Sequence, residues 1–511
     1  MTIRIATNSV NNHSVRSLLS KQAEATPDAP YLIDDKGQTL SFSEVEKRAK
    51  AVASMIAECG VEPGESVAFA MANNVDTALV ILGALYGGFL TVAVNLVAGQ
   101  ETISYVLEHS RTRLVLHDEG AASLIKSALP PHSPPPELVQ ISSEAFANPP
   151  AGHADVKATA DGILMYTSGT TGRPKGVVLT HGNLLAGGAN SVLAHELTAD
   201  DRAFCVLPLY HINGLCVTLL GPLVSGSSVV IPPKFRVSTF WQTAAERKCT
   251  WLSLVPTQIS YLLHEVQTAE PQTDIRFARS ASAPLSPDVQ AAFEAAFGVP
   301  IVETMGLTET AAQILSNPLP PGTRKIGSPG VAFGNEVVVA DPLGKEMPRG
   351  EEGELLVRGP NVMREYLDNE KATDESLSHD GWLRTGDLGR MDAEGYVFIT
   401  GRLKELIIKG GENIAPREID DALYSHPDVI EAAAFALACP HYGEKVEAGV
   451  VLKEGTDIDG PGLVAHCRVR VGSFKAPDHV HVFEELPKGP SGKIQRIKLA
   501  SLVQHDARAD P

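Results

Sequence analysis

The hydrophobic pattern of the first 120 residues alternates between two periods. Short apolar runs predict buried strands, and between them apolar residues recur at helical spacing. One helix is marked at its start by Ser41 and Glu44, the two members of a capping box. This alternation predicts a parallel sheet covered by helices on both faces. The expected strands are 31–33, 67–71, 91–94 and 114–117, and the expected helices are 15–25, 41–60, 75–86 and 102–109.

Three further units follow along the chain. A second series of strands and helices comes first, a β-rich stretch begins near Val331, and a small unit begins near residue 405. We therefore predict an α/β fold. Its large N-terminal domain, 1–402, has two βαβ-type sheets plus a β-rich subdomain, and a small, mobile α+β C-terminal domain, 403–511, follows. The strands expected in these units are 203–207, 228–231, 250–254, 275–279, 336–340, 353–358, 396–399, 432–438, 448–452 and 480–483.

Composition and charge exclude several classes of protein. The uncharged segment 78–98 is long enough for a membrane span, but Gly87 and Gly88 interrupt it, so we interpret it as a buried helix followed by a strand. A net charge of −18 argues against a general nucleic-acid or anionic-membrane binder. Six cysteines lack C-x-x-C spacing, and the N-terminus lacks a signal-peptide pattern. We expect a cytoplasmic protein without membrane insertion.

A stretch rich in glycine and hydroxyl groups lies between two apolar runs, 163–166 and 177–179, which predict the strands of a hairpin. Glycine lets backbone N–H groups turn towards an anion, and hydroxyls and a lysine add donors and charge. The pair Arg173-Pro174 excludes a Walker loop, which needs Lys directly after its last glycine. The hairpin therefore predicts a polyphosphate site. Its candidate residues are Thr167, Ser168, Gly169, Thr170, Thr171, Gly172 and Lys175.

The segment from Tyr166 to Gly176 closely resembles the signature of the adenylate-forming superfamily, which includes acyl-CoA synthetases, the adenylation domains of peptide synthetases and luciferases. Further blocks that resemble this family follow in order, over roughly residues 15 to 500. The resemblance implies ATP, Mg²⁺ and coenzyme A as ligands. It also implies that a carboxylic acid is activated as an acyl-adenylate before transfer to a thiol.

The block from Leu207 to Gly214 resembles the border of the family's acyl pocket, which implies that His211, Asn213 and Gly214 contact the acid. Amino-acid-activating relatives carry an Asp after the histidine position. Ile212 stands there in this chain, which argues against an α-amino acid substrate. Arg279 ends a predicted strand and either faces a second carboxylate of the substrate or pairs with an internal acid.

Two later blocks imply contacts with adenine and phosphate. The small residues Ser282 and Ala283 resemble the loop that borders adenine and the substrate. The block around Thr308 resembles the family's Y-G-x-T-E motif. This similarity implies that Thr308 binds phosphate and that Glu309 holds Mg²⁺, a cation that prefers carboxylate oxygen. Met305 stands where relatives often carry an aromatic ring against adenine, and Gly306 follows it.

The last blocks imply the residues that contact the ribose, the hinge between the domains and the residues that the C-terminal domain contributes. Asp387 matches the aspartate that binds both ribose hydroxyls, and Arg402 matches an arginine on ribose or phosphate. Lys404 occupies the family's hinge position. The resemblance also implies that the glycine pair Gly410-Gly411 borders the CoA channel and that Lys493 contacts the carboxylate oxygen and the α-phosphate.

These expectations combine into a carboxylate–CoA ligase that releases AMP and pyrophosphate, with a small or polar acid as substrate. Its catalytic residues are expected to be His211, Thr308, Glu309 and Lys493. Medium-chain fatty acids and aryl acids stay open as substrates. A stand-alone adenylating enzyme that serves a carrier protein is one alternative, and a non-catalytic scaffold with the same fold is another. A homodimer is expected without support from a specific motif.

Overall fold

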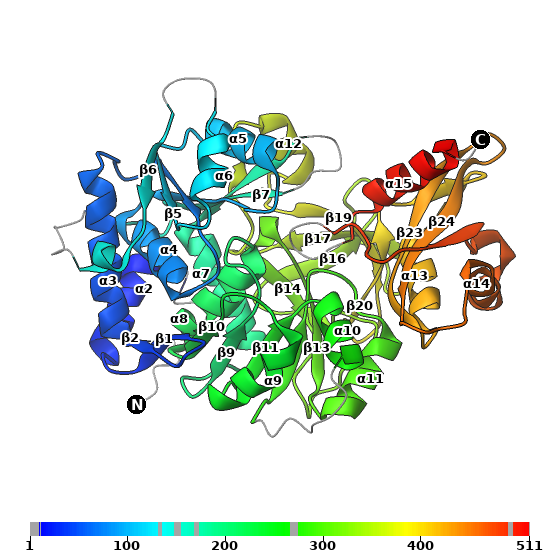
Figure 1. Ribbon diagram of the computed structural model, residues 1–511, viewed down its shortest axis with the longest axis horizontal. Helices are drawn as coiled ribbons and strands as arrows, with labels where there is room; N and C mark the ends of the chain where they lie inside the picture. The colour runs from blue at the N-terminus through cyan, green and yellow to red at the C-terminus, as the bar shows by residue number, and fades with distance from the viewer. Residues whose placement is uncertain are drawn as a thin grey trace.

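The computed structural model describes residues 10, 12–130, 135–147, 155–167, 173–265, 274–488 and 494–509. Within this part of the chain, the strands form four sheets (Figure 1). Two large sheets and one small antiparallel sheet precede residue 403, and the C-terminal sheet follows it. The chain therefore has the α/β class and the sequence of units that its hydrophobic pattern predicts.

The first large sheet has the strand order β18-β8-β7-β4-β3-β5-β6. Its strands β3 to β6 run parallel, and β8 returns antiparallel along β7 with Lys175 opposite Thr167, as the predicted hairpin requires. The interpretation of segment 78–98 is confirmed, because α4 (Val75–Gly87) is followed by β4. The bounds are β3 Ser66–Ala70, β4 Leu90–Ala93, β5 Leu114–His117, β6 Glu137–Gln140, β7 Asp161–Thr167, β8 Lys175–Thr180 and β18 Glu365–Tyr366.

The second large sheet has the order β15-β14-β13-β12-β11-β9-β10-β1-β2. Its strand β1 comes first in the chain, yet it pairs in parallel with β10, almost 200 residues later. Strand β13 pairs in parallel with β12 through Glu303 and then antiparallel with β14 from Thr304. The bounds are β1 Pro30–Asp34, β2 Thr39–Ser41, β9 Arg202–Cys205, β10 Ser228–Ile231, β11 Trp251–Leu254, β12 Phe277–Ser280, β13 Ile301–Leu307, β14 Ala312–Ser316 and β15 Val331–Ala332.

A shared helical layer joins the two large sheets into one core. A single buried cluster contains Phe69 of β3, Leu82 of α4 and Val229 of β10, and burial of apolar surface is the main force that holds such a core. The capping box of α3 forms as predicted: the Ser41 N–H donates to the Glu44 carboxylate at 2.8 Å. The helices are α2 Val15–Ala25, α3 Phe42–Glu58, α5 Gln100–His109, α6 Ala122–Ser127, η1 Ser143–Phe146, α7 His181–Ala194, η2 Asn213–Leu220, α8 Gly221–Ser225, α9 Val237–Glu246, α10 Pro256–Glu265, α11 Pro287–Phe297, η3 Thr308–Thr310 and α12 Glu370–Ser376.

The chain passes from the small sheet to the C-terminal sheet between Arg402 and Ile407, and Lys404 lies in this connection. Figure 1 shows the C-terminal unit, in orange and red, at one side of the molecule next to β20, α10 and α11. A boundary at residue 402 and a swing about Lys404 stay predictions. The bounds are β16 Glu336–Ala340, β17 Glu352–Arg358, β19 Leu383–Met391, β20 Val397–Arg402, β21 Ile407–Lys409, β22 Glu412–Ile414, α13 Pro416–Tyr424, β23 Val429–Cys439, β24 Gly443–Leu452, α14 Gly460–Lys475, β25 His479–Val482 and α15 Arg496–Ala509.

Candidate active site

Arg279 lies where the carboxyl ends of parallel strands meet, the edge at which α/β sheets bind ligands. It is the next-to-last residue of β12, paired with Ser253 of β11, and only 1% of its surface is exposed. Its Nη1 donates to Asn213 Oδ1 at 2.6 Å and to Ser253 Oγ at 3.3 Å, and its Nε donates to Gln313 Oε1 at 3.1 Å. All three acceptors are uncharged, so they orient the guanidinium without neutralising it.

The charge of Arg279 has no acidic partner in the part of the chain that the structure describes. Burial lowers the pKa of Arg279 to about 9, which leaves the group protonated at neutral pH. A buried charge without a counter-ion is costly, so this arrangement is suited to an anion that arrives with the ligand. Of the two interpretations open for Arg279, the described residues thus favour a second anionic group of the substrate over an internal acid.

The loop predicted to border adenine, around Ser282, contacts the block predicted to border the acyl pocket, Leu207 to Gly214. Asn213 begins η2, and its Nδ2 donates to Ser282 Oγ at 3.4 Å. Ser282 has φ +75°, an uncommon conformation for a residue with a side chain, which costs about 1–3 kcal/mol and is typical of functional sites. His211 is half-buried, with its ring centroid 4.7 Å from that of Tyr210. A Cβ on Gly214 would approach Pro208 O to 2.3 Å, so this position packs against backbone.

Glu309 lies in η3 next to the hairpin that carries Lys175. Tyr366 of β18 donates a hydrogen bond from its hydroxyl to Glu309 Oε1 at 2.8 Å. Lys175 Nζ lies 4.5 Å from the centroid of the Tyr366 ring, so the predicted phosphate and metal ligands share one tyrosine. Among the described residues, no cluster of three or more His, Cys, Asp or Glu side chains could hold a metal. One carboxylate fits Mg²⁺, which commonly takes its other ligands from phosphates and water.

Asp387 and Arg402 form a cross-strand pair between β19 and β20. The Arg402 Nε donates to Asp387 Oδ1 at 2.6 Å, and only 4% of Asp387 is exposed. Burial alone would lower the pKa of Arg402, but the carboxylates of Asp387, Glu405 and Glu309 raise it above its usual value. The predicted ribose contacts therefore lie within electrostatic reach of the predicted metal ligand. An ordered carboxylate of this kind can accept hydrogen bonds from two neighbouring hydroxyls.

The C-terminal unit contacts the large domain at α10. Lys488 Nζ donates to the hydroxyl of Tyr261 in α10 at 2.8 Å and lies 2.7 Å from Glu431 of β23. An isolated bridge joins Lys488 to Ile494, so the two ends of the segment that contains Lys493 lie side by side. Gly410 and Gly411 form the exposed tip of the β21–β22 hairpin, with φ +60° and +87°.

Some predicted residues lie outside the described part of the chain, and some described residues were not predicted. Ser168, Gly169, Thr170, Thr171, Gly172 and Lys493 lie outside it. Sequence reasoning missed Ser253, Gln313 and Tyr366, because their roles come from neighbours that are distant in sequence. Among these three residues, only Gln313 had a local signal of a special role in the sequence, because it is a polar residue within the otherwise apolar run 312–315.

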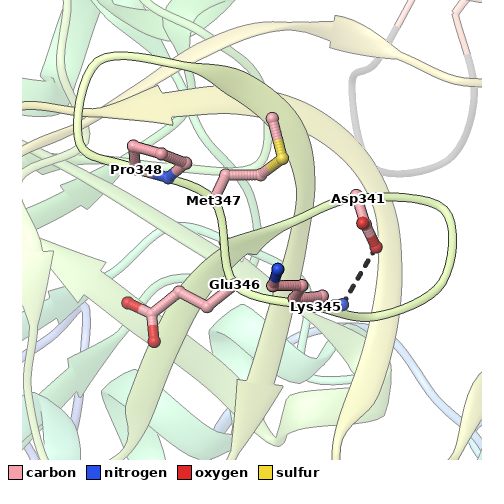
Figure 2. A pocket seen from close by; sticks show the side chains of 5 residues that line it. All are labelled: Asp341, Lys345, Glu346, Met347 and Pro348. Carbon is pink, nitrogen blue, oxygen red and sulfur yellow. Dashed lines mark hydrogen bonds between the residues drawn. The ribbon is translucent and has the colours of Figure 1, made fainter.

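A hollow on the surface beside β16 does not belong to this site. Figure 2 shows its lining by Asp341, Lys345, Glu346, Met347 and Pro348. The Lys345 N–H donates to Asp341 Oδ1 at 3.0 Å, so the hollow is the outside of a turn between β16 and β17. None of the helices in the described residues combines the length and the apolar character that crossing a bilayer requires.

Comparisons with known proteins identify the family to which the chain belongs. The family description "AMP-binding enzyme" matches residues 19–367, and "AMP-binding enzyme C-terminal domain" matches residues 418–493. The chain is 45% identical to a sulfoacetate–CoA ligase of Cupriavidus necator (95% of this chain, 97% of the relative). It is 33% identical to an oxalate–CoA ligase of Arabidopsis thaliana (95% and 98%). The crystal structure of ATP-bound MatB from Rhodopseudomonas palustris superposes with a TM-score of 0.88 at 29% identity (96% and 99%).

Fold and site together define an adenylate-forming ligase, an enzyme that activates a carboxylic acid with ATP. The chain belongs to the AMP-binding enzyme family within the adenylate-forming superfamily. It is an AMP-forming carboxylate–CoA ligase that uses ATP, Mg²⁺ and coenzyme A. The sequence-based predictions of family, fold and reaction are confirmed, and the scaffold and carrier-protein alternatives find no support.

Proposed function

We propose that this ligase acts on a small carboxylic acid that carries a second anionic group, either a carboxylate or a sulfonate. The observation that carries the proposal is the buried Arg279, which is held by neutral acceptors and has no acidic partner among the described residues. Two relatives support it by name, one a sulfoacetate–CoA ligase and the other an oxalate–CoA ligase. A fatty or aryl acid would leave this charge without a counter-ion.

In the activation step, we assign the reacting carboxylate of the acid to the side of the pocket near His211. The carboxylate oxygen attacks the α-phosphorus of ATP, and the bond to pyrophosphate breaks. Charge accumulates on the phosphoryl oxygens during this step, so a well-placed cation such as Lys493 lowers the barrier. The remaining proposed ATP contacts are Thr167, Ser168, Gly169, Thr170, Thr171, Gly172, Lys175, Ser282, Ala283, Met305, Gly306, Thr308, Asp387 and Arg402, with Glu309 as the Mg²⁺ ligand.

In the transfer step, we propose that the C-terminal domain turns about Lys404 and brings Gly410-Gly411 to the site. The CoA thiol then attacks the acyl carbonyl and displaces AMP. The exposed tip of the β21–β22 hairpin supports this role, since glycines without side chains let a narrow ligand approach the backbone.

The test compares matched acids in a pyrophosphate-release assay. Sulfoacetate, oxalate and malonate serve as dianions, and acetate, propionate, benzoate and octanoate serve as monoanions. We expect higher kcat/KM for the dianions and a selective loss in Arg279→Met. Removing one member of a buried charge pair costs about 2–5 kcal/mol, which corresponds to a loss of about 30-fold or more. Arg279→Lys keeps the charge and serves as the control.

Two results would overturn this proposal. One is a wild-type enzyme that turns over monoanions as well as dianions of similar size. The other is an Arg279→Met variant that loses activity equally towards both groups of acids.

We also propose a cytoplasmic location and a homodimer. All six cysteines are free, which is usual for proteins of a reducing compartment. Cell fractionation tests the location, and light scattering of the purified protein tests the dimer.

A further inference from the structure

Gln313 of β14 lies behind Arg279 and is fully buried. Its Oε1 accepts two hydrogen bonds, one from Arg279 Nε at 3.1 Å and one from His195 Nε2 at 3.0 Å. An arginine can only donate, so the amide oxygen and not the amide nitrogen must face it. Two donors on one oxygen fix the side-chain amide, and the amide in turn fixes the plane of the guanidinium.

His195 is the second donor to Gln313 Oε1, and its own position is fixed by aromatic packing. Its ring packs in a tilted orientation on Phe277, with centroids 5.1 Å apart, and lies near Trp251. Burial, followed by the charge of Arg279, lowers the pKa of His195 to about 3, so the ring is neutral at pH 7. Its hydrogen then sits on Nε2, where the acceptor is. Behind Arg279 the structure therefore places a neutral donor and a neutral acceptor.

We propose that Gln313 is a specificity-determining residue, because it satisfies Arg279 Nε while adding no negative charge. This inference rests on the proposed function, since the charge that it preserves is the one assigned to the second anionic group of the substrate. A carboxylate has almost the same shape as an amide, but at this position it would form a buried ion pair with Arg279. The pocket would then hold a neutral pair, and it would no longer favour a dianionic acid.

The test is the ratio of kcat/KM for malonate to kcat/KM for propionate, which have similar size and differ in charge. We expect Gln313→Glu to lower this ratio by at least about tenfold, the lower end of measured couplings between close charges. The loss should appear mainly in KM for malonate. Gln313→Met removes the acceptor without adding a buried charge, and we expect it to lower the ratio less than Gln313→Glu does. Thermal denaturation checks that each variant is folded.

A double-mutant cycle separates this inference from a merely structural role. In the Arg279→Met background, burial without a cation keeps the carboxyl introduced by Gln313→Glu protonated, so this substitution should leave the ratio unchanged. A wild-type ratio in Gln313→Glu, together with a reduced ratio in Arg279→Met, would overturn the inference and leave the proposed function intact. An equal reduction by Gln313→Glu in both backgrounds would also overturn it. A wild-type enzyme without preference for malonate would instead overturn the proposed function.

Discussion

Gly306 offers the sharpest structural test of the site, because the space around it is fixed by backbone. It lies on β13 opposite Gln313 of β14, next to a shift in the register of the two strands. A Cβ at this position would lie 1.7 Å from Ala312 O and 2.4 Å from Ala312 C. An ordinary carbon–oxygen contact is about 3.3 Å, so β13 and β14 would have to separate by about 1.5 Å.

Gly306→Ala should therefore destabilise the protein by about 3 kcal/mol, at the upper end of overpacking substitutions, because backbone atoms cannot rotate away. Thr308 and Glu309 follow in the chain, and Gln313 lies opposite. We expect a higher KM for ATP and for the acid together with a lower melting temperature.

The measurements are thermal denaturation and pyrophosphate release under titration of each substrate. Gly221→Ala is the matched control, since at this buried glycine of α8 the added Cβ would lie 3.9 Å from Cys216 O and 4.0 Å from Gly188 O, which are ordinary contacts. Alanine there should be neutral or stabilise by up to about 1 kcal/mol. Wild-type melting and wild-type KM values in Gly306→Ala would refute the reasoning.

Two further predictions concern carboxylates. Asp387→Asn should raise the KM for ATP about tenfold or more, because a hydrogen bond to a charged acceptor contributes about 1.5–3 kcal/mol. If titration with ATP gives an unchanged KM, Asp387 does not contact the ribose. Burial alone would raise the pKa of Glu447, but hydrogen bonds from His481, Lys445 and His479 lower it to about 2. Its stabilisation is thus present above about pH 4.5 and is lost as the pH falls towards 2. Glu447→Gln should lower the free energy of unfolding at pH 7 by about 1–3 kcal/mol, a range that allows for solvent screening near the exposed His479. Urea denaturation measures this loss, and the difference in unfolding free energy between wild type and variant should be smaller at pH 4 than at pH 7.

Local signals in the sequence carried much of the fold. The capping box at Ser41 and Glu44, the two strands of the phosphate hairpin and the helix-then-strand interpretation of 78–98 all depend on residues that are close together in the sequence. Such features are set by neighbours in the chain, so periodicity and capping rules suffice to find them. The family signature at Tyr166–Gly176 then implied the reaction.

The parts that sequence did not predict depend on long-range packing. Nothing near β1 indicates that it joins β10, because parallel pairing is decided by which buried faces meet in three dimensions. The same holds for the site: Arg279, Gln313 and His195 come from three elements, and only their packing shows that the arginine is buried among neutral partners. By itself, the sequence determined the elements, the family and the chemistry of activation. The tertiary structure alone decided which charge in the acyl pocket is left uncompensated, since the electrostatic environment of a side chain is set by contacts that the order of residues does not contain.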